Sequence, residues 1–584
     1  MTKPDPITLG VVWGAFHSIA VEIGTTIHRT AYSPQAREGQ DFSVAIFDAE
    51  GRMVVQGPYT PGHLGAMNFA VLNVIEAHPP ETLRPGDAIL LNDPALGSGH
   101  LPDFFLTQPV FHDGELVAFT TNLLHHSDVG GSRPGSQAVE GIFDYHQEGL
   151  FIPPIKVVEE GREVDPAWQL IVTNSRAPHY VLGDLRAQRN SIRVGEQRIG
   201  ELFERYGTET IRACMGAIMD QSEARMRARI REIPDGTYRF EDFMDDCGPG
   251  TPPIRMAVAV TVDGDSMLID WDGTDPQTDS GLNSYINYTR SYTYMAVKCL
   301  TDPHGPMSGG SLRPITMVAP EGSFVNPRRP AGGGPRAVAC HRIFETVMGA
   351  LAKAMPEEVT AACSQMANPT WGGINRETGR RFVGYELVFG GTGARATVDG
   401  EEAMSSPFNA SNIPVEAIEI NQPVMVERFE IIPDTGGAGK FRGGCGIRRD
   451  IRMLADAIRF TNLSDRNVVA PFGIFGGNSG ALGTTVVNPG RDGAIEPGSK
   501  ASFDMEYGDV VSIRLAGAGG YGDPLERDPE RVARDVRLGY VSPGLARSDY
   551  GVVIANDGTV DEEETTRLRA EMAAARPAES RAAG

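Results

Sequence analysis

Short apolar segments separated by glycine-containing turns restrict the fold of this chain more than any other feature. Two hairpins are expected early, over residues 42–55 and 104–121, and from about residue 380 to 520 glycine stands at nearly every turn. Short apolar runs between turns are typical of strands. In residues 7–27 and 183–232, by contrast, the apolar residues recur at helical intervals. The pattern predicts a multi-lobed α+β protein with mixed and antiparallel sheets, flanking helices and glycine-rich turns.

The 584 residues suggest about three or four domains by length alone. We expect an N-terminal lobe over 1–240 that ends in a helical segment, followed by a β-rich lobe over 241–527. The last part, 528–584, is predicted to be a helical segment that runs into a disordered tail, because its end is charged and rich in alanine.

Charge and cysteine usage exclude several classes of function. The chain has 53 lysine and arginine residues against 76 aspartate and glutamate residues, a formal charge of −23 at pH 7. This acidic balance argues against a nucleic-acid or anionic-membrane partner, since both require a basic face. Six cysteines without a Cys-x-x-Cys pair disfavour a disulfide framework and fit a reducing compartment. We expect a cytoplasmic protein with no nucleic-acid and no membrane partner.

The apolar stretch 7–16 could imitate a signal peptide. Asp5 precedes it, however, and apolar residues continue at helical spacing to Ile27. We interpret this segment as the first helix of the mature protein. Because no apolar run reaches about 18 residues, we expect no transmembrane helix.

Two glycine-rich segments imitate nucleotide-binding loops. Residues 517–522 match G-x-G-x-x-G, but Asp523-Pro524 follow where a helix must open, so we expect a tight glycine-rich turn. Gly439-Lys440 is followed by Phe441 where a P-loop needs serine or threonine. The chain therefore shows no ATP site of its own.

Histidines concentrate in the predicted N-terminal lobe. Seven of the 12 histidines lie between residues 63 and 146, among them those of His100-Leu101-Pro102-Asp103 and His125-His126-Ser127-Asp128. Imidazole and carboxylate ligands suit Zn²⁺, Mn²⁺ or Fe²⁺, and the absence of a nearby thiolate favours a catalytic over a structural site. On spacing alone two interpretations stay open, a divalent-metal site and histidines that are scattered as surface or core residues.

The hairpin 104–121 brings the two histidine segments together, since His100 and Asp103 precede its first strand and His125 and His126 end its second. A two-residue turn at Asp113-Gly114 would pair position 103 with 124 and put His126 on the face of Asp103. A type I turn with a glycine bulge would pair 103 with 123 and put His125 there. Spacing alone does not decide between these registers.

Several stretches together resemble one family. They are Arg37-Glu38-Gly39-Gln40-Asp41-Phe42-Ser43, Asn92-Asp93-Pro94, 100–103, 125–131, 313–316, 434–446 and 517–525. In this order the chain resembles the hydantoinase B / 5-oxoprolinase family, the B component of ATP-dependent hydantoinases and lactamases, to which acetone and acetophenone carboxylase subunits are related. The loop 331–335 is richer in glycine than the family pattern.

The resemblance implies a single divalent metal held by Asp41, His100, Asp103 and His125. This choice selects the bulged register of the hairpin, with His126 as the second choice. The stretch 61–65 also matches, so His63 is implied to contact substrate or water. Asp93, in the matched Asn92-Asp93-Pro94 loop, and His126, beside His125, are the other implied catalytic residues.

The family further implies a two-subunit reaction. A hydantoinase A-like ATPase partner of the actin/Hsp70 type would bind ATP and Mg²⁺ and phosphorylate the ring carbonyl oxygen. This chain would then open a hydantoin, 5-oxoproline or related lactam ring with a water that its metal activates. A hetero-oligomer such as A2B2 is expected. The alternatives are a component of an ATP-dependent ketone carboxylase, whose related subunit is longer, and a noncatalytic scaffold for the A subunit.

Overall fold

The first sheet carries the histidine segments. The computed structural model describes residues 4–404 and 406–575. The sheet has the order β2-β1-β5-β4-β3-β6-β7, with every neighbouring pair antiparallel. Its strands are β1 (Phe42–Asp48), β2 (Met53–Gln56), β3 (Ala88–Leu91), β4 (Asp103–His112), β5 (Glu115–His125), β6 (Ile155–Glu159) and β7 (Arg162–Glu163).

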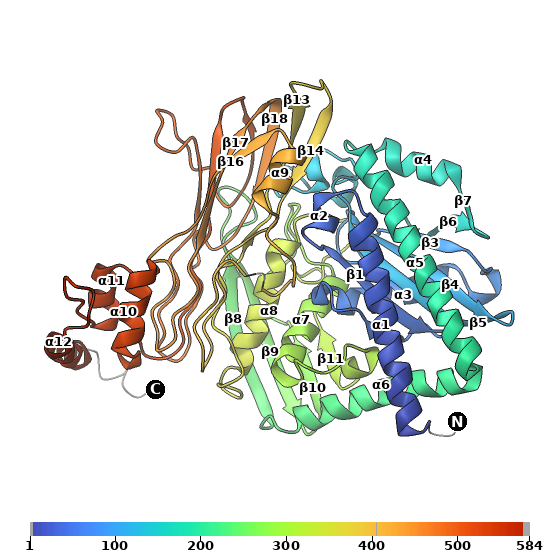
Figure 1. Ribbon diagram of the computed structural model, residues 1–584, viewed down its shortest axis with the longest axis horizontal. Helices are drawn as coiled ribbons and strands as arrows, with labels where there is room; N and C mark the ends of the chain where they lie inside the picture. Colours follow the sequence, from blue (N-terminus) through green and yellow to red (C-terminus); the bar gives the residue numbers. More distant parts are fainter. Residues whose placement is uncertain (1–3, 405, 576–584) are drawn as a thin grey trace.

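Helices cover both faces of this sheet. Figure 1 shows α1 (Pro6–Thr30) and α5 (Pro178–Tyr206) side by side, and both pack with Phe42, Val44 and Ile46 on one face. The opposite face, with Ala45 and Phe47, packs on α3 (Leu64–Ala77). Strand residues alternate between these faces because successive side chains point to opposite sides.

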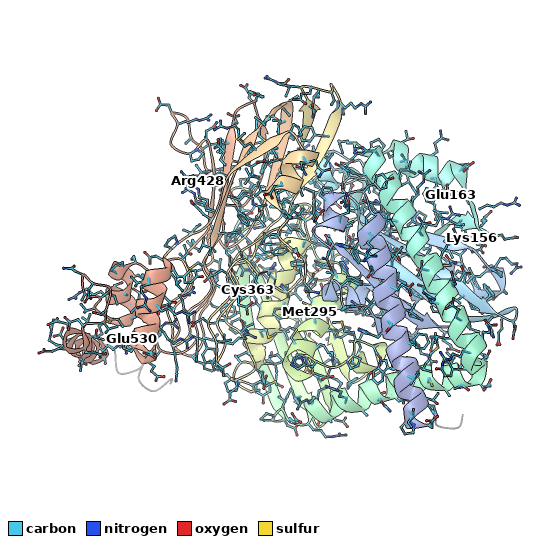
Figure 2. All side chains as sticks on the ribbon, viewed as in Figure 1. Lys156, Glu163, Met295, Cys363, Arg428 and Glu530 are labelled. Carbon is cyan, nitrogen blue, oxygen red and sulfur yellow. The ribbon has the colours of Figure 1, made fainter. Side chains whose placement is uncertain are left out.

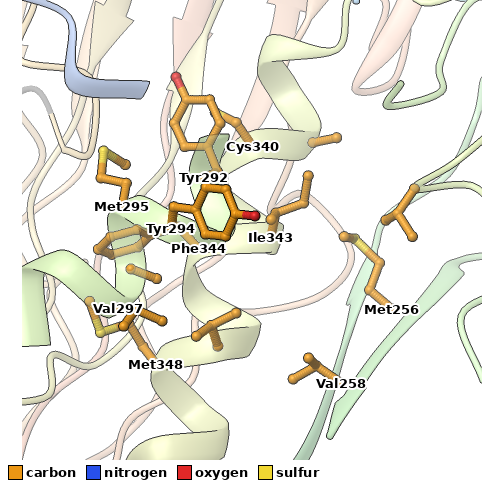
Figure 3. Packing of buried hydrophobic residues seen from close by; sticks show 14 of the residues in the cluster. Met256, Val258, Tyr292, Tyr294, Met295, Val297, Cys340, Ile343, Phe344 and Met348 are labelled. Atoms are coloured by element: carbon orange, nitrogen blue, oxygen red, sulfur yellow. The ribbon is translucent and has the colours of Figure 1, made fainter. Parts of the chain in front are cut away.

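Two long helices form the centre of the molecule. α7 (Ile286–Thr301) packs on α3 and on α8 (Ala337–Leu351), and α8 packs on the second sheet. Figure 3 shows side chains of α7, α8 and β9 interlocked there, among them Tyr292, Phe344 and Met256. The second sheet is mixed, because β10 and β11 pair in parallel; its strands are β8 (Gly236–Met244), β9 (Ile254–Asp263), β10 (Ser266–Asp270) and β11 (Ile315–Val318).

The C-terminal half adds small antiparallel sheets and a helical end. The sheet strands are β12 (Met366–Ala367), β13 (Thr370–Asn375), β14 (Arg381–Tyr385), β15 (Val388–Phe389), β16 (Val424–Ile431), β17 (Ile447–Met453), β18 (Ala455–Leu463), β19 (Thr484–Val487), β20 (Lys500–Met505) and β21 (Val510–Arg514).

In Figure 2, Met295 and Cys363 lie in the middle of the molecule, with Glu530 of the helical end and Lys156 of the first sheet towards opposite sides.

The remaining helices flank these sheets. They are α2 (Pro34–Arg37), α4 (Asp165–Thr173), α6 (Thr208–Ile230), α9 (Val415–Asn421), α10 (Pro529–Leu538), α11 (Pro543–Tyr550) and α12 (Glu562–Ala575). The predicted α+β class with mixed and antiparallel sheets is confirmed. The predicted domain boundaries stay predictions, and the predicted tail after α12 lies outside the described residues.

Among the described residues, α1 is the one helix that is long and apolar enough to cross a membrane by length and composition alone. One face of it is buried in the core of the protein.

One expectation needs correction. Residues 517–522 do not form a tight turn. Their amides donate to separate segments, Gly517 to the Ala481 carbonyl oxygen and Ala518 to the Gly444 carbonyl oxygen, and among these glycines only Gly522 has a positive φ, of 72°. A Cβ at Gly517 would lie 1.7 Å from the Thr435 carbonyl oxygen, so glycine serves close backbone packing there.

Candidate metal centre

Three neighbouring strands bring candidate ligands into one row. Asp103 begins β4 and His125 ends β5, and the two residues pair directly. Asp41 precedes β1, and its carbonyl oxygen accepts a hydrogen bond from the His125 amide at 3.2 Å. Directly opposite residues on adjacent strands share a face. All three side chains therefore belong to the α3 face of the first sheet.

The hairpin has neither of the two registers considered from the sequence. His112 pairs with Glu115, so Asp113-Gly114 is a two-residue turn, with φ values of 51° and 80° as in type I′. The register then shifts by one residue, because Val110 pairs with Ala118 and Phe111 with Leu116. This bulge within the strands, and not at the turn, places His125 opposite Asp103.

The ligand atoms lie at the spacing that a divalent ion imposes. His100 Nε2 lies 2.9 Å and His125 Nδ1 lies 3.2 Å from Asp103 Oδ1, and the two nitrogens are 3.3 Å apart. Bonds of roughly 2.1 Å to one ion would separate neighbouring ligands by about 3.0–3.4 Å in octahedral or tetrahedral geometry. All three side chains are buried. The triangle of donor atoms therefore fits Zn²⁺, Mn²⁺ or Fe²⁺.

The hydrogen bonding of His100 leaves a place for a cation. Its Nδ1 lies 2.8 Å from the Gly334 carbonyl oxygen and must donate to it. Burial, together with the charge of Arg336, lowers the pKa of His100 to about 3, so the ring is neutral at pH 7. Nε2 then presents a lone pair to Asp103 Oδ1, which is also an acceptor. His125 Nε2 is buried without a hydrogen-bond partner. Converging acceptors of this kind suit a metal ion.

Oδ2 of Asp103 accepts hydrogen bonds from residues that the sequence pattern did not single out. Oδ2 accepts hydrogen bonds from Ser98 Oγ and from the Arg336 guanidinium. Arg336 also donates to the Ser98 carbonyl oxygen, and its guanidinium carbon lies 3.9 Å from the centroid of the Tyr288 ring. These contacts turn Oδ1 of Asp103 towards the two histidines. Arg336 comes from the loop before α8, so no local pattern connects it with His100.

Asp41 and His63 lie beside the cluster. The mutually close ligand atoms come from His100, Asp103 and His125, without Asp41. Burial raises the pKa of Asp41, and the charge of nearby His125 opposes that rise. His63 Nδ1 lies 2.8 Å from Oγ of Ser43, which is two residues after Asp41 and so on the same face. Burial lowers the pKa of His63 to about 4.

The other two predicted residues lie outside the cluster. Asp93 Oδ2 forms an ion pair with Arg329 at 2.9 Å. His126 faces α5, where its Nε2 lies 2.9 Å from Gln188 Oε1 and its ring contacts Phe104. Consecutive residues of a strand point to opposite faces, which separates His126 from His125. The catalytic roles of Asp93 and His126 stay predictions.

The C-terminal half closes one side of the cluster. The Tyr385 ring of β14 lies against the His125 ring, with centroids 4.5 Å apart. The centre therefore lies where the first sheet, the loop before α8 and the sheet of β13 and β14 meet. Like Arg336, Tyr385 gave no sequence signal, because only the folded chain brings it near His125.

Known proteins resemble this chain along nearly its whole length. The family model described as hydantoinase B/oxoprolinase matches residues 5–524. A protein of Pseudomonas sp. (strain NS671), named as the B component of a D-/L-hydantoinase, is 33% identical over 97% of this chain and 98% of its own.

Two solved structures are also similar. The crystal structure of the ATP-dependent caprolactamase from Pseudomonas jessenii matches 97% of this chain and 100% of that chain, with a TM-score of 0.88 and 31% identity. An acetone carboxylase structure matches 99% of this chain and 84% of that chain, with a TM-score of 0.90 but 21% identity, a likeness of fold alone. The resemblance stated from the sequence is confirmed, and the chain belongs to the hydantoinase B/oxoprolinase family.

Proposed function

We propose that this chain is the metal-binding B component of an ATP-dependent cyclic amidohydrolase, which opens a hydantoin, 5-oxoproline or related lactam ring. The observation that carries the proposal is the convergence of His100 Nε2, Asp103 Oδ1 and His125 Nδ1 within 3.3 Å of one another. The hydantoinase and caprolactamase named among the relatives support the substrate class.

His100, Asp103 and His125 would hold the ion, with Asp41 beside them. When bound, a divalent ion polarises carbonyl groups and lowers the pKa of water to near 7. Arg336 would keep Asp103 oriented by holding its second oxygen. This arrangement gives the buried carboxylate a fixed direction before any substrate arrives.

His63 is suited to accept a proton. The single hydroxyl hydrogen of Ser43 is donated to the Thr60 carbonyl oxygen at 2.8 Å. His63 Nδ1 must therefore donate to Ser43 Oγ, which leaves the lone pair on Nε2. A neutral imidazole with a free Nε2, on the same face as Asp41, is a candidate general base.

Activation by ATP is assigned to a separate protein. The sequence carries no phosphate-binding loop, and residues 517–522 are packed against neighbouring backbone. We propose a hydantoinase A-like ATPase partner that binds ATP and Mg²⁺, in a cytoplasmic hetero-oligomer such as A2B2. Ketone carboxylation is not favoured, because the acetone carboxylase likeness is one of fold alone.

The test is reconstitution with an A-type partner. The complex should open at least one of hydantoin, 5-oxoproline and caprolactam in an ATP-dependent way, whereas the chain alone should hydrolyse neither ATP nor the ring. The matched control is a complex with His100→Ala, which should lose ring opening. Robust ATP turnover by the isolated chain would overturn the two-subunit scheme. Bicarbonate-dependent consumption of acetone would favour the carboxylase instead.

A further inference from the structure

The glycine-rich loop before α8 is held by side chains from distant segments. We call residues 331–334 the glycine loop. Its polar contacts are Tyr285 Oη to the Ala331 carbonyl oxygen at 2.8 Å, Asn283 Nδ2 to the Gly332 carbonyl oxygen at 2.9 Å, and Glu148 Oε1, which accepts from the Gly333 amide at 2.9 Å and from the Gly334 amide at 2.8 Å. Side chains from distant segments thus hold two carbonyl groups and two amide groups of the loop.

The glycine loop passes directly over the residue before His100. A Cβ at Gly333 would lie 2.5 Å from the Gly99 carbonyl oxygen, so a side chain there would push the loop away from this segment. The next residue, Gly334, presents its carbonyl oxygen to His100 Nδ1 at 2.8 Å. The position of this one carbonyl group determines which nitrogen of His100 carries the hydrogen.

Glu148 is buried, with 2% of its surface exposed, and it does not contact the ligand atoms. It follows the short helix η4 (Tyr145–Gln147) and reaches the amides of Gly333 and Gly334 with one oxygen. Burial raises the pKa of Glu148 to about 8, so the carboxyl group is largely neutral at pH 7, and its Oε1 accepts both amide hydrogen bonds as a carbonyl oxygen does. Removal of this side chain would leave two buried amides without a partner.

We propose that Glu148 is a positioning residue for the metal centre. This inference rests on the proposed metal-binding function. Glu148 fixes the amides of the glycine loop, the loop fixes the Gly334 carbonyl oxygen, and that oxygen holds His100 with Nδ1 protonated. Nε2 is then left with its lone pair towards Asp103 Oδ1 and the ion. A group two steps from the ion thereby determines how well His100 is prepared to bind it.

Asp245 provides a matched control. It also has a buried carboxyl group that accepts two backbone amides, from Asn467 at 2.6 Å and from Val469 at 2.8 Å. These contacts join the end of β8 to the segment after β18, and none of them reaches the metal ligands. Asp245→Ala therefore reproduces the loss of a buried acceptor of two amides without touching the glycine loop.

The experiment compares metal-free wild type, Glu148→Ala, Glu148→Gln and Asp245→Ala. Affinity for Mn²⁺ and Zn²⁺ is measured by titration, and amide hydrogen exchange is followed in peptides that cover residues 331–334. Glu148→Ala should weaken metal binding about 10- to 100-fold, the range seen for residues that orient metal ligands. It should also speed exchange at Gly333 and Gly334. Glu148→Gln, which keeps an acceptor oxygen, should lose less, and Asp245→Ala should change neither readout.

Unchanged metal affinity in folded Glu148→Ala would overturn the positioning role, as would an equal loss in Asp245→Ala. If Glu148→Ala does not fold, Glu148→Asp replaces it, because this change shortens the side chain by one methylene and should also weaken metal binding. Unchanged metal affinity in Glu148→Asp would likewise overturn the positioning role. A wild-type chain that binds neither ion nor Fe²⁺ would contradict the proposed function itself and the role that rests on it.

Discussion

Two buried groups of charged side chains in this molecule differ in how their donors and acceptors are arranged. In the metal centre, the lone pair of His100 Nε2 faces Asp103 Oδ1, and His125 Nδ1 lies within 3.3 Å of both atoms. The other group, which we call the ion-pair joint, links α8, β8, the segment after β18 and the start of β20. Its members are Arg342, Arg466 and Lys500 with Asp242, Glu345 and Asp465.

In the ion-pair joint every carboxylate faces cationic groups. Arg342 donates to Asp465 at 2.8 Å, Arg466 to Glu345 at 2.6 Å, and Lys500 to Asp465 at 2.8 Å. Burial alone therefore does not identify a functional site. In the ion-pair joint each carboxylate meets a nitrogen donor, as expected of a structural contact. In the metal centre Arg336 satisfies only Oδ2 of Asp103, and Oδ1 faces the lone pair of His100 Nε2, an arrangement that suits a cation.

The largest effect on stability is expected in the ion-pair joint. Arg342→Ala would leave buried carboxylates without their partner, which costs about 3–5 kcal/mol of unfolding free energy. Metal affinity should be unchanged. Urea unfolding and metal titration of the purified variant check both expectations.

The control for this variant is Arg376→Ala, which removes a half-exposed ion pair with Asp456. Its expected loss is about 1 kcal/mol or less, because water screens such pairs. Loss of metal by Arg342→Ala would show that the ion-pair joint and the metal centre are coupled, and would contradict the expectation that the joint is purely structural.

Removing a ligand of the metal centre should weaken metal binding strongly and reduce stability less than a change in the ion-pair joint does. His100→Ala is expected to weaken metal binding by more than about 100-fold, beyond the range for residues outside the ligand shell. In the metal-free chain it should cost less stability than Arg342→Ala, because it removes one of the facing acceptors. Elemental analysis and metal titration measure the first effect. Full metal content in both His100→Ala and Asp103→Ala would rule out this centre.

Local patterns in the sequence predicted much of the fold. The residues expected on one helical face, among them Val12, Phe16 and Ile23, are buried in α1. The turn at Asp113-Gly114 was also recognisable, because both residues accept positive φ. The segment 183–232 was seen as helical, and the structure divides it into α5 and α6 at Gly207, where φ is 80°.

The surroundings of the metal centre could not be predicted in the same way. Arg336, Glu148 and Tyr385 reach the centre from separate segments, and contacts between distant segments leave no periodic signal. The bulge in the hairpin had an overlooked marker, because Pro109 stands in β4 next to the register shift that follows Val110. These neighbours of the metal centre therefore become visible only in the folded structure, because they are brought together by packing and not by spacing along the chain.

Among the histidines close to the metal centre, the smallest effect on metal binding is expected at His126, although it is the nearest neighbour of His125 in the chain. His126 lies on the α5 face, where its Nε2 meets Gln188 at 2.9 Å. His126→Ala would leave Gln188 without this partner, which costs about 1–3 kcal/mol of stability. Metal affinity should change less than about 10-fold, the lower limit for residues that orient ligands. His125→Ala is the matched variant, and it should lose the metal as His100→Ala does. Metal content of both variants, and ring opening by both in complex with an A-type partner, decide between the two faces of the strand. If His126→Ala loses the metal and His125→Ala keeps it, the register that pairs Asp103 with His125 does not describe the working centre.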